Sequence, residues 1–282
     1  MKMRFFADAR RRRPGYYLAR FLLILLMALT FFPFVLLFLM SLKLDIMIRV
    51  DFFGLPNPVQ WSNYTKGFSE IIRPIFNSLI IAAASLVGIL TLVSLSGFAF
   101  GRYRFKGRGI LFGMVLMVMM IPHCLTIIPV FTIVNNLQLI GSRWALILPY
   151  VAGQQILGVI LLTSFYSSLP EEMFEAARIE GANELFAFLR IGLPLSVPTL
   201  ITVGITSVVA MYNDYIWPTL VVTKVTQKTF AQAVFAVATG NGAVNYGVMS
   251  AVYVIGTIPL LLLTLSCLRY YLQGMLEGAI KG

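Results

Sequence analysis

The 282-residue sequence is 59% hydrophobic with a mean hydropathy of +0.87, and charged residues make up only 12% of it. A soluble domain of this size exposes far more charge, so the composition excludes an ordinary soluble protein and indicates a membrane protein. The net charge of +11 does not indicate a nucleic-acid-binding face, because basic residues gather beside apolar runs, as at 10–13 and 102–108.

The apolar runs predict an all-α polytopic membrane protein with six transmembrane helices, because each span needs about 20 mostly apolar residues. The predicted spans cover residues 17–42, 74–100, 109–134, 144–167, 197–222 and 248–271. The first run is too long for a signal-peptide core, so we expect it to be retained. Pro122 and Pro129 fall within the third span, where neighbouring helices tolerate the kinks. The patterns G-F-A-F-G at 97–101 and G-I-L-F-G at 109–113 are weak signals of close helix packing.

The spans divide the chain into a basic N-terminal tail at 1–16, the first span, an extracytoplasmic loop at 43–73, a core of five spans at 74–271 and a tail at 272–282. The core includes a long polar loop at 168–198. With the N-terminus inside, 13 of the 22 Lys and Arg residues fall in the cytoplasmic segments and seven in the outer segments, which have about the same total length. The positive-inside rule therefore places both termini and the polar loop in the cytoplasm.

Two long segments are expected on the outer side. The 43–73 loop carries P-N-P at 56–58 followed by Trp61, which indicates turns and an interfacial helix. The 223–247 segment is of mixed polarity and rich in Gly and Asn near its end. It is either a bare connector or the surface that meets an extracytoplasmic binding protein.

The polar loop between the fourth and fifth spans carries five of the chain's eleven acids. Charges at this density exclude the loop from hydrocarbon. Pro170 fits the first position of a helix, and Gly181 is expected to bend or end it. Asn183 is a plausible cap for a second helix, which Gly192 and Pro194 are expected to stop.

The apolar residues of this loop indicate a docking element. Phe174, Ala177, Gly181, Leu185 and Phe188 recur at steps of three and four, which predicts one shared helix face. A solvated loop that merely joins two spans would have a similar composition. The acids are better explained as a solvated face that complements the helix dipole than as an acid and base pair.

No catalytic or cofactor-binding motif accompanies these features. The sequence has no G-x-x-x-x-G-K-[ST], no H-E-x-x-H and no G-x-S-x-G. Cys124, Cys267 and His123 have no metal-ligand spacing, and we expect His123 to be a packed or bundle-facing side chain. The chain is therefore predicted to bind no cofactor of its own and not to be an enzyme.

Polar residues inside two predicted spans are candidates for a translocation pathway. Tyr212, Asn213 and Asp214 lie in the fifth span, and a carboxylate there must be paired or face water. Asp214 either lines or gates a cavity, or it bonds to a neighbouring helix and closes a helix break. Gln154 and Gln155 in the fourth span are similar, with one expected to face the bundle.

The spacing within the polar loop resembles the signature loop of permease subunits of ATP-binding-cassette importers. That pattern is E-A-A, an acidic residue with Gly and Ala soon after, and an apolar residue and Leu-Pro further on. The matching residues are Glu175, Ala176, Ala177, Glu180, Gly181, Ala182, Phe188, Leu193 and Pro194. Glu180 stands where the family usually has Asp, which is a conservative departure.

Nearly the whole chain is similar to the maltose-type group of sugar permeases. The residues that carry this are Asn77-Ser78, A-F-G-R-Y-R-F-K-G-R at 99–108, M-I-P at 120–122, Y-N-D-Y-I-W-P at 212–218 and the tail at 274–282. The group more often has Trp where this chain has Tyr212, which weakens a pocket assignment there. The resemblance implies a type I importer permease fold with a cytoplasmic coupling-helix loop.

The resemblance also implies the partners. It predicts a second permease subunit, two copies of a cytoplasmic ATPase that hold ATP and Mg, and an extracytoplasmic solute-binding protein, all at a bacterial inner membrane. The signature-loop residues would couple to the ATPase, and Glu277, Gly278 and Lys281 of the tail would contact it. The expected solute is a sugar or oligosaccharide. The alternatives are another solute, such as a phosphorylated polyol, or a membrane enzyme or scaffold without an ATPase partner.

Overall fold

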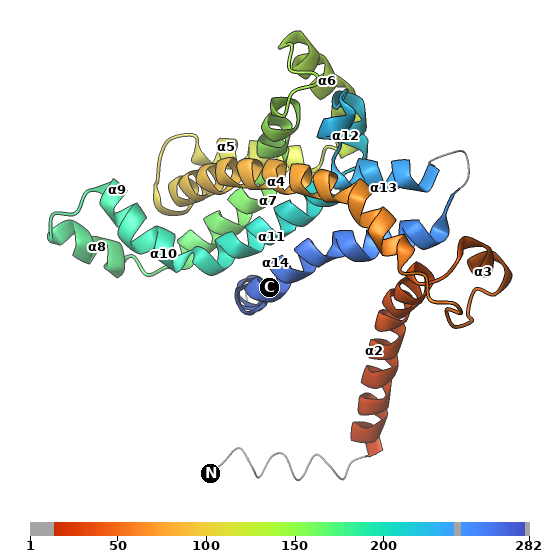
Figure 1. Cartoon of the computed structure of the whole chain (residues 1–282). Coiled ribbons are helices and arrows are strands. Elements are labelled where there is room, and N and C mark those ends of the chain that lie inside the picture. Colours follow the sequence, from red (N-terminus) through yellow and green to blue (C-terminus); the bar gives the residue numbers. More distant parts are fainter. Residues whose placement is uncertain (1–13, 240–243, 280–282) are drawn as a thin grey trace. The chain divides into compact units, whose positions relative to one another are not determined.

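The computed structural model describes residues 14–239 and 244–279, and every regular element within these two stretches is helical (Figure 1). In chain order the α-helices are α2 Pro14–Ser41, α3 Asp45–Val50, α4 Ser62–Arg102, α5 Arg108–Met119, α6 His123–Asn136, α7 Trp144–Ser168, α8 Glu172–Ile179, α9 Glu184–Ala187, α10 Leu193–Leu195, α11 Val197–Asn213, α12 Ile216–Val221, α13 Phe230–Thr239 and α14 Tyr246–Ala279. A π-helical turn covers Phe188–Gly192, and a 3-10 turn covers Val225–Gln227. The basic tail predicted at 1–16 lies outside the described residues up to residue 13.

The count of long apolar helices agrees with a six-span protein. In the described part, four helices are long and apolar enough to cross a membrane: α2, α4, α7 and α14. Two bent pairs raise the number to six if each pair is one span. These pairs are α5 with α6, and the segment Glu184–Leu195 with α11.

The chain divides into two compact units, and the smaller one comprises the chain up to residue 69 together with 237–255. At the end of α2 the side-chain amide of Asn63 donates to the carbonyls of Ser41 and Lys43, at 3.0 and 2.8 Å. Helix ends leave carbonyl groups without partners, so this buried amide stabilises the turn that follows α2. Asp45 pairs with Arg49 at 2.9 Å and accepts the backbone N–H of Tyr246 at 2.8 Å.

The 43–73 loop is shorter than predicted. It contains α3, a six-residue helix, but α4 begins at Ser62 and not at 74. Ile71 and Ile75, one helical turn apart, are buried on the same face, so tertiary packing extends the helix in front of Pro74. Pro74 therefore lies inside α4 and not at its start, and it removes one backbone hydrogen bond from the helix.

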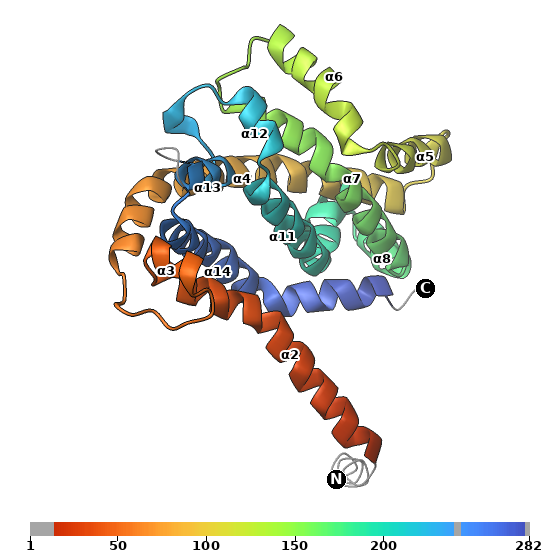
Figure 2. The same ribbon diagram turned by 90° about the vertical axis from the view of Figure 1, so that its right-hand side faces the viewer.

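The larger unit comprises residues 70–236 and the chain from 256 onward, and α4, α7 and α11 contribute most of its core. α11 runs beside α7 in both ribbon views (Figures 1 and 2). α4 approaches α7 closely at its glycines, because a Cβ at Gly97 would lie 2.5 Å from the Leu162 Cβ, and one at Gly101 would lie 2.6 Å from the Tyr166 Cβ. The 97–101 pattern is therefore a true packing signal, whereas a Cβ added at Gly109 or Gly113 would meet nothing within 4 Å.

The third predicted span is not one helix. α5 ends at Met119, α6 begins at His123, and the two helices are bent by 102°. Pro122 itself is non-helical, with ψ 131°. It also disfavours helical geometry at Ile121, the residue before it. The expectation of a kinked but continuous helix over 109–134 is corrected to a broken one.

The 223–247 segment is more ordered than a bare connector. It begins with the 3-10 turn and continues into α13. The Asn77 side-chain amide donates to the carbonyls of Thr226 and Lys228, both at 3.0 Å, and the Ser78 hydroxyl accepts the N–H of Phe230 at 2.8 Å. The Asn77-Ser78 pair of the sequence therefore holds this segment on α4.

Candidate functional site

The polar loop folds as two short helices separated by a glycine turn. α8 begins at Glu172, two residues later than the start predicted at Pro170. It ends at Ile179, and the chain turns at Gly181, whose φ of +85° lies in the left-handed region that favours glycine. Asn183 then caps α9 by accepting the N–H of Phe186 at 2.8 Å. The predicted break at Gly181 and the predicted cap at Asn183 are both confirmed.

The end of the loop differs from the prediction. Gly192 and Pro194 do not stop the second helix, because the chain continues through the π-helical turn into α10 and bends only at Ser196. Gly192 has helical φ and ψ and is buried against the ring of Phe98. Pro194 lies in the first turn of α10, where a missing N–H costs little. The hydroxyls of Tyr166 and Ser196 are 2.9 Å apart and tie the bend to α7.

One part of the loop packs into the larger unit. Phe174 and Phe188 are buried, and their rings lie 5.9 and 5.1 Å from the ring of Phe98 on α4. Tyr166 of α7 is 5.2 Å from the same ring in an edge-on arrangement. Buried aromatic pairs of this kind add about 0.5–1.5 kcal/mol each beyond the burial of area. Phe98 therefore anchors the loop to both α4 and α7.

The other part of the loop faces outward. The nine motif residues separate into an exposed set, Glu175, Ala176, Glu180, Gly181 and Pro194, a buried set, Ala177 and Phe188, and a half-buried pair, Ala182 and Leu193. The predicted single face is corrected, because Gly181 and Leu185 are exposed, the latter at 62%. The reversal at Gly181 turns α9 away from the face that α8 buries. Ile179, Leu185 and Phe186 are large apolar side chains of this loop that are exposed.

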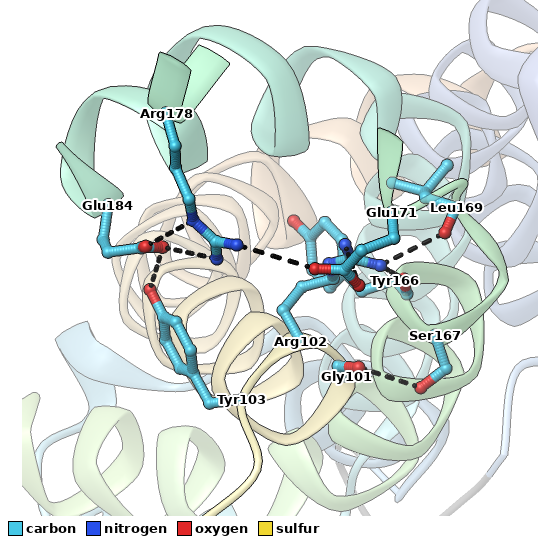
Figure 3. A network of polar contacts seen from close by, with 9 residues as sticks. All are labelled: Gly101, Arg102, Tyr103, Tyr166, Ser167, Leu169, Glu171, Arg178 and Glu184. Atoms are coloured by element: carbon cyan, nitrogen blue, oxygen red, sulfur yellow. Dashed lines mark hydrogen bonds and ion pairs between the residues drawn. The ribbon is translucent and has the colours of Figure 1, made fainter. Parts of the chain in front are cut away.

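Ion pairs join this loop to the end of α4 (Figure 3). Arg102 donates to Glu171 at 2.8 Å and to the carbonyl of Leu169 at 3.1 Å. Arg178 of α8 pairs with Glu184 at 2.9 Å and with Glu171 at 3.6 Å. The Tyr103 hydroxyl completes the network by donating to Glu184 at 3.0 Å.

The network shifts the pKa of three of its members, and the bond to Glu184 raises that of Arg178. The hydrogen bond from Arg178 lowers the pKa of Glu184 from its ordinary 4.5. Burial, and then the bond to Glu184, raises the pKa of Tyr103. Because a lowered carboxyl pKa contributes stability above the unfolded value, the Glu184 pair is complete at neutral pH and is lost only as the pH falls below 4.5. Both partners of the Arg178–Glu184 pair are largely exposed, so the gain in stability is small.

Asp214 closes a helix break. α11 ends at Asn213 and α12 begins at Ile216, so the fifth predicted span is interrupted. The Asp214 carboxylate accepts the Tyr150 hydroxyl at 2.9 Å and the backbone N–H of Trp217 at 3.3 Å. The Trp217 indole donates to the carbonyl of Ala145 at 3.0 Å. Of the two interpretations of Asp214, this geometry matches the bond to a neighbouring helix across a break.

The remaining candidate residues occupy different environments. Tyr212 is buried, donates to the carbonyl of Gly256 at 2.9 Å and stacks on Phe230, so its ring belongs to the packed interior. Asn213 is exposed, while Gln154 and Gln155 are half-buried in α7. Tail residue 281 lies outside the described residues. Of Glu277 and Gly278 in α14, the structure describes only the backbone.

One pocket in the larger unit has an apolar lining. It measures about 190 Å³ and lies between α4, α11 and α14, with Leu86, Leu200, Ile205 and Leu263 among its lining residues. A polar solute needs hydrogen-bonding groups in its pocket, so this cavity does not suit one. Within the described part of the chain, no group of three or more His, Cys, Asp or Glu residues is placed to hold a metal ion.

Asp214 supports a prediction about the α11–α12 break. Replacing Asp214 with Ala leaves the buried Tyr150 hydroxyl without its partner and removes the acceptor of the Trp217 N–H, so we expect about 1–3 kcal/mol of lost stability. Asp214→Asn keeps an oxygen acceptor and is the matched control. Thermal unfolding of the two variants in detergent measures the difference. Equal melting temperatures for the wild type and Asp214→Ala would contradict a bonding role.

Comparisons with known proteins place the chain among transport proteins. The family model described as "Binding-protein-dependent transport system inner membrane component" matches residues 94–277, which include the whole polar loop. The trehalose/maltose transport system permease protein of Thermococcus litoralis is 30% identical over 267 residues, 92% of this chain and 94% of the relative. The sn-glycerol-3-phosphate transport system permease protein of Salmonella typhi is 32% identical over 203 residues, 72% of each chain. The solved structure of a bacterial ABC transporter involved in alginate import has the same fold, with a TM-score of 0.78, 19% identity and coverage of 90% of this chain and 95% of that chain.

Proposed function

Because this chain belongs to the family of binding-protein-dependent transport system inner membrane components, we propose that it imports a sugar or oligosaccharide as one transmembrane subunit of an ATP-driven importer. The observation that carries this proposal is the match over 94–277, which includes a loop whose motif residues are partly anchored and partly exposed. The chain is a multi-pass membrane protein and a transporter permease subunit. Covalent chemistry is no part of its role.

Relatives of stated substrate support a sugar. The trehalose/maltose permease aligns with almost the entire chain, and the sequence also resembles the maltose-type group in its tail. The glycerol-3-phosphate permease aligns with a shorter part at similar identity, so a phosphorylated polyol is the second candidate. Both candidates are polar solutes that hydrocarbon excludes, and both require a path lined by hydrogen-bonding groups.

We propose that the exposed motif residues form the coupling surface. Glu175, Ala176 and Gly181 would lie in a groove of a cytoplasmic ATPase, with Ala177 and Phe188 holding the loop from behind. Two ATPase copies bind ATP and Mg in this proposal, and this chain binds neither. Closure of the ATPase dimer would move the coupling loops and shift the spans between inward-open and outward-open states, which requires ATP to bind the closed state more tightly.

The other partners and the orientation complete the proposal. A second permease subunit would form the other half of the pathway, and an extracytoplasmic binding protein would deliver the solute. Both termini would lie on the cytoplasmic side of a bacterial inner membrane, as the distribution of basic residues indicates. Asn213, Gln154 and Gln155 are proposed to lie along the pathway. Asp214, bonded to Tyr150, would hold the break between α11 and α12 beside them, and Tyr212 would support them from the interior.

The C-terminal tail is proposed to add a second contact with the ATPase. Glu277, Gly278 and Lys281 are the residues involved, and they follow the long helix α14. Deleting the tail from residue 276 onward should weaken recovery of the ATPase without removing it. The coupling loop remains the main contact in this proposal.

The first test is affinity purification of the tagged chain from its native membrane, followed by mass spectrometry. We expect to recover a second permease and an ATPase with a Walker-type phosphate loop. Isothermal titration of the associated binding protein with maltose, trehalose and glycerol-3-phosphate then separates the two solute classes. Recovery of the chain alone, or with unrelated enzymes only, would overturn the importer proposal.

A further inference from the structure

We propose that Arg102 clamps the coupling loop to α4, so that the loop and the cytoplasmic end of α4 move as one rigid body. This inference rests on the proposed function. It assigns Arg102 as a positioning residue, because the guanidinium contacts the protein only. The consequence is a direct mechanical path from the coupling loop to the second span, in addition to the chain connections to α7 and α11.

Arg102 is a buried cation. Its side chain is only 6% exposed, although the residue ends a 41-residue apolar helix at an expected membrane surface. A buried guanidinium is costly unless its N–H groups are bonded. An arginine that only added to the excess of positive charge on the cytoplasmic side would instead extend into water.

Arg102 joins α4 to the end of α7 and to α8. One nitrogen donates to Glu171 at 2.8 Å, and another donates to the carbonyl of Leu169 at 3.1 Å and to that of Tyr166 at 3.5 Å. These acceptors belong to the end of α7 and to the residue just before α8. The guanidinium carbon lies 4.1 Å from the ring centre of Phe174, which is inside α8. The planar fork of arginine makes all these contacts together, and lysine cannot.

Further contacts join the end of α4 to the end of α7 and to the coupling loop (Figure 3). The Ser167 hydroxyl donates to the carbonyl of Gly101 at 3.3 Å, and Tyr103 donates to Glu184 at 3.0 Å. Phe98, one helical turn before Arg102, packs on both Phe174 and Phe188. α4 therefore holds α8, α9 and the π-helical turn at separate points, and separate points prevent rotation about any single one.

Arg178 provides a matched control within the same network. It pairs with Glu171 and Glu184, but its side chain is 42% exposed and contacts only carboxylates of the loop itself. Exposed ion pairs contribute little to stability. Removing its charge also removes a cation from this network, while the bonds of Arg102 to the carbonyls of Leu169 and Tyr166 and its contact with Phe174 remain.

The variant test compares Arg102→Gln, Arg102→Lys and Arg178→Gln in the purified importer reconstituted with its binding protein. We expect Arg102→Gln to lower the solute imported per ATP hydrolysed about tenfold, a size found for residues that connect coupled sites. Arg102→Lys should show a partial loss, and Arg178→Gln should match the wild type. Equal ratios for Arg102→Gln and Arg178→Gln, with the ATPase bound in both, would overturn the clamp.

A crosslinking test does not depend on the folding of an Arg102 variant. Tyr103 and Glu184 are replaced by cysteine in a chain carrying Cys124→Ser and Cys267→Ser, and the pair is bridged with reducible bis-thiosulfonate reagents of graded length. If the loop and α4 move as one body, the bridged importer transports normally. Transport that stops on bridging and returns on reduction would overturn the inference. A wild-type chain that recovers no ATPase would instead contradict the proposed function, so the two failures are distinguishable.

Discussion

Replacing Gly181 with Glu is expected to lower solute uptake at least about tenfold while leaving the chain inserted in the membrane. A Cβ at Gly181 meets nothing within 4 Å in this chain, so the first carbon of the new side chain causes no clash within the subunit. Its φ of +85° adds strain of about 1–2 kcal/mol for a residue with a Cβ. The larger effect arises because Gly181 is exposed beside Glu175 and Glu180 on the proposed coupling surface. A lost central contact worth about 2 kcal/mol lowers affinity roughly 30-fold.

The measurement is uptake together with recovery of the ATPase on the tagged chain. Gly181→Asn is the control, because asparagine tolerates the left-handed conformation and adds no charge. We expect this variant to retain most of the uptake. Wild-type uptake and ATPase recovery by Gly181→Glu would remove the coupling surface from this part of the loop.

Replacing Gly97 with Ala is expected to destabilise the chain by about 1–3 kcal/mol, although the change adds a single methyl group. That methyl would lie 2.5 Å from the Cβ of Leu162 and 3.3 Å from its backbone carbonyl carbon. The neighbour is the base of a side chain and its backbone, so it cannot move without separating α4 from α7. Reduced yield of the folded chain in detergent and a lower unfolding temperature should follow.

Gly153→Ala is the matched control, since Gly153 lies on α7 and a Cβ there meets nothing within 4 Å. Alanine favours helix more than glycine by about 1 kcal/mol, so this variant should be neutral or slightly more stable. A Gly97→Ala chain as stable as Gly153→Ala would show that α4 and α7 do not pack this closely in the membrane.

The polar loop was predictable from the sequence in its local features. Gly181 and Asn183 act through their own backbone and side-chain chemistry, so their residue types sufficed to predict the break and the cap. The predicted stop at Gly192 and Pro194 was wrong because helical continuation there depends on Phe98, which lies about 90 residues earlier in the chain. Spacing in the sequence carries no information about such a partner.

The candidate site was incomplete for the same reason. Arg102 was visible only as one of several basic residues after an apolar run, and its burial by Phe174 and Glu171 comes from the packing of α8 on α4. Tyr150 carried no signal at all, because its bond to Asp214 joins helices far apart in the sequence. The single signal available for Arg102 was its place in the motif at 99–108.

The sequence by itself determined the membrane class, the approximate span positions, the polar loop and the resemblance of that loop to a coupling motif. These follow from composition and short-range spacing, which act through the hydrophobic effect and the chemistry of single residues. The tertiary structure decided which motif residues are buried, where the third and fifth spans break, and which arginine is clamped. Each of these depends on side chains that meet only when separate helices pack against one another, and that packing is not written in the spacing of any one segment.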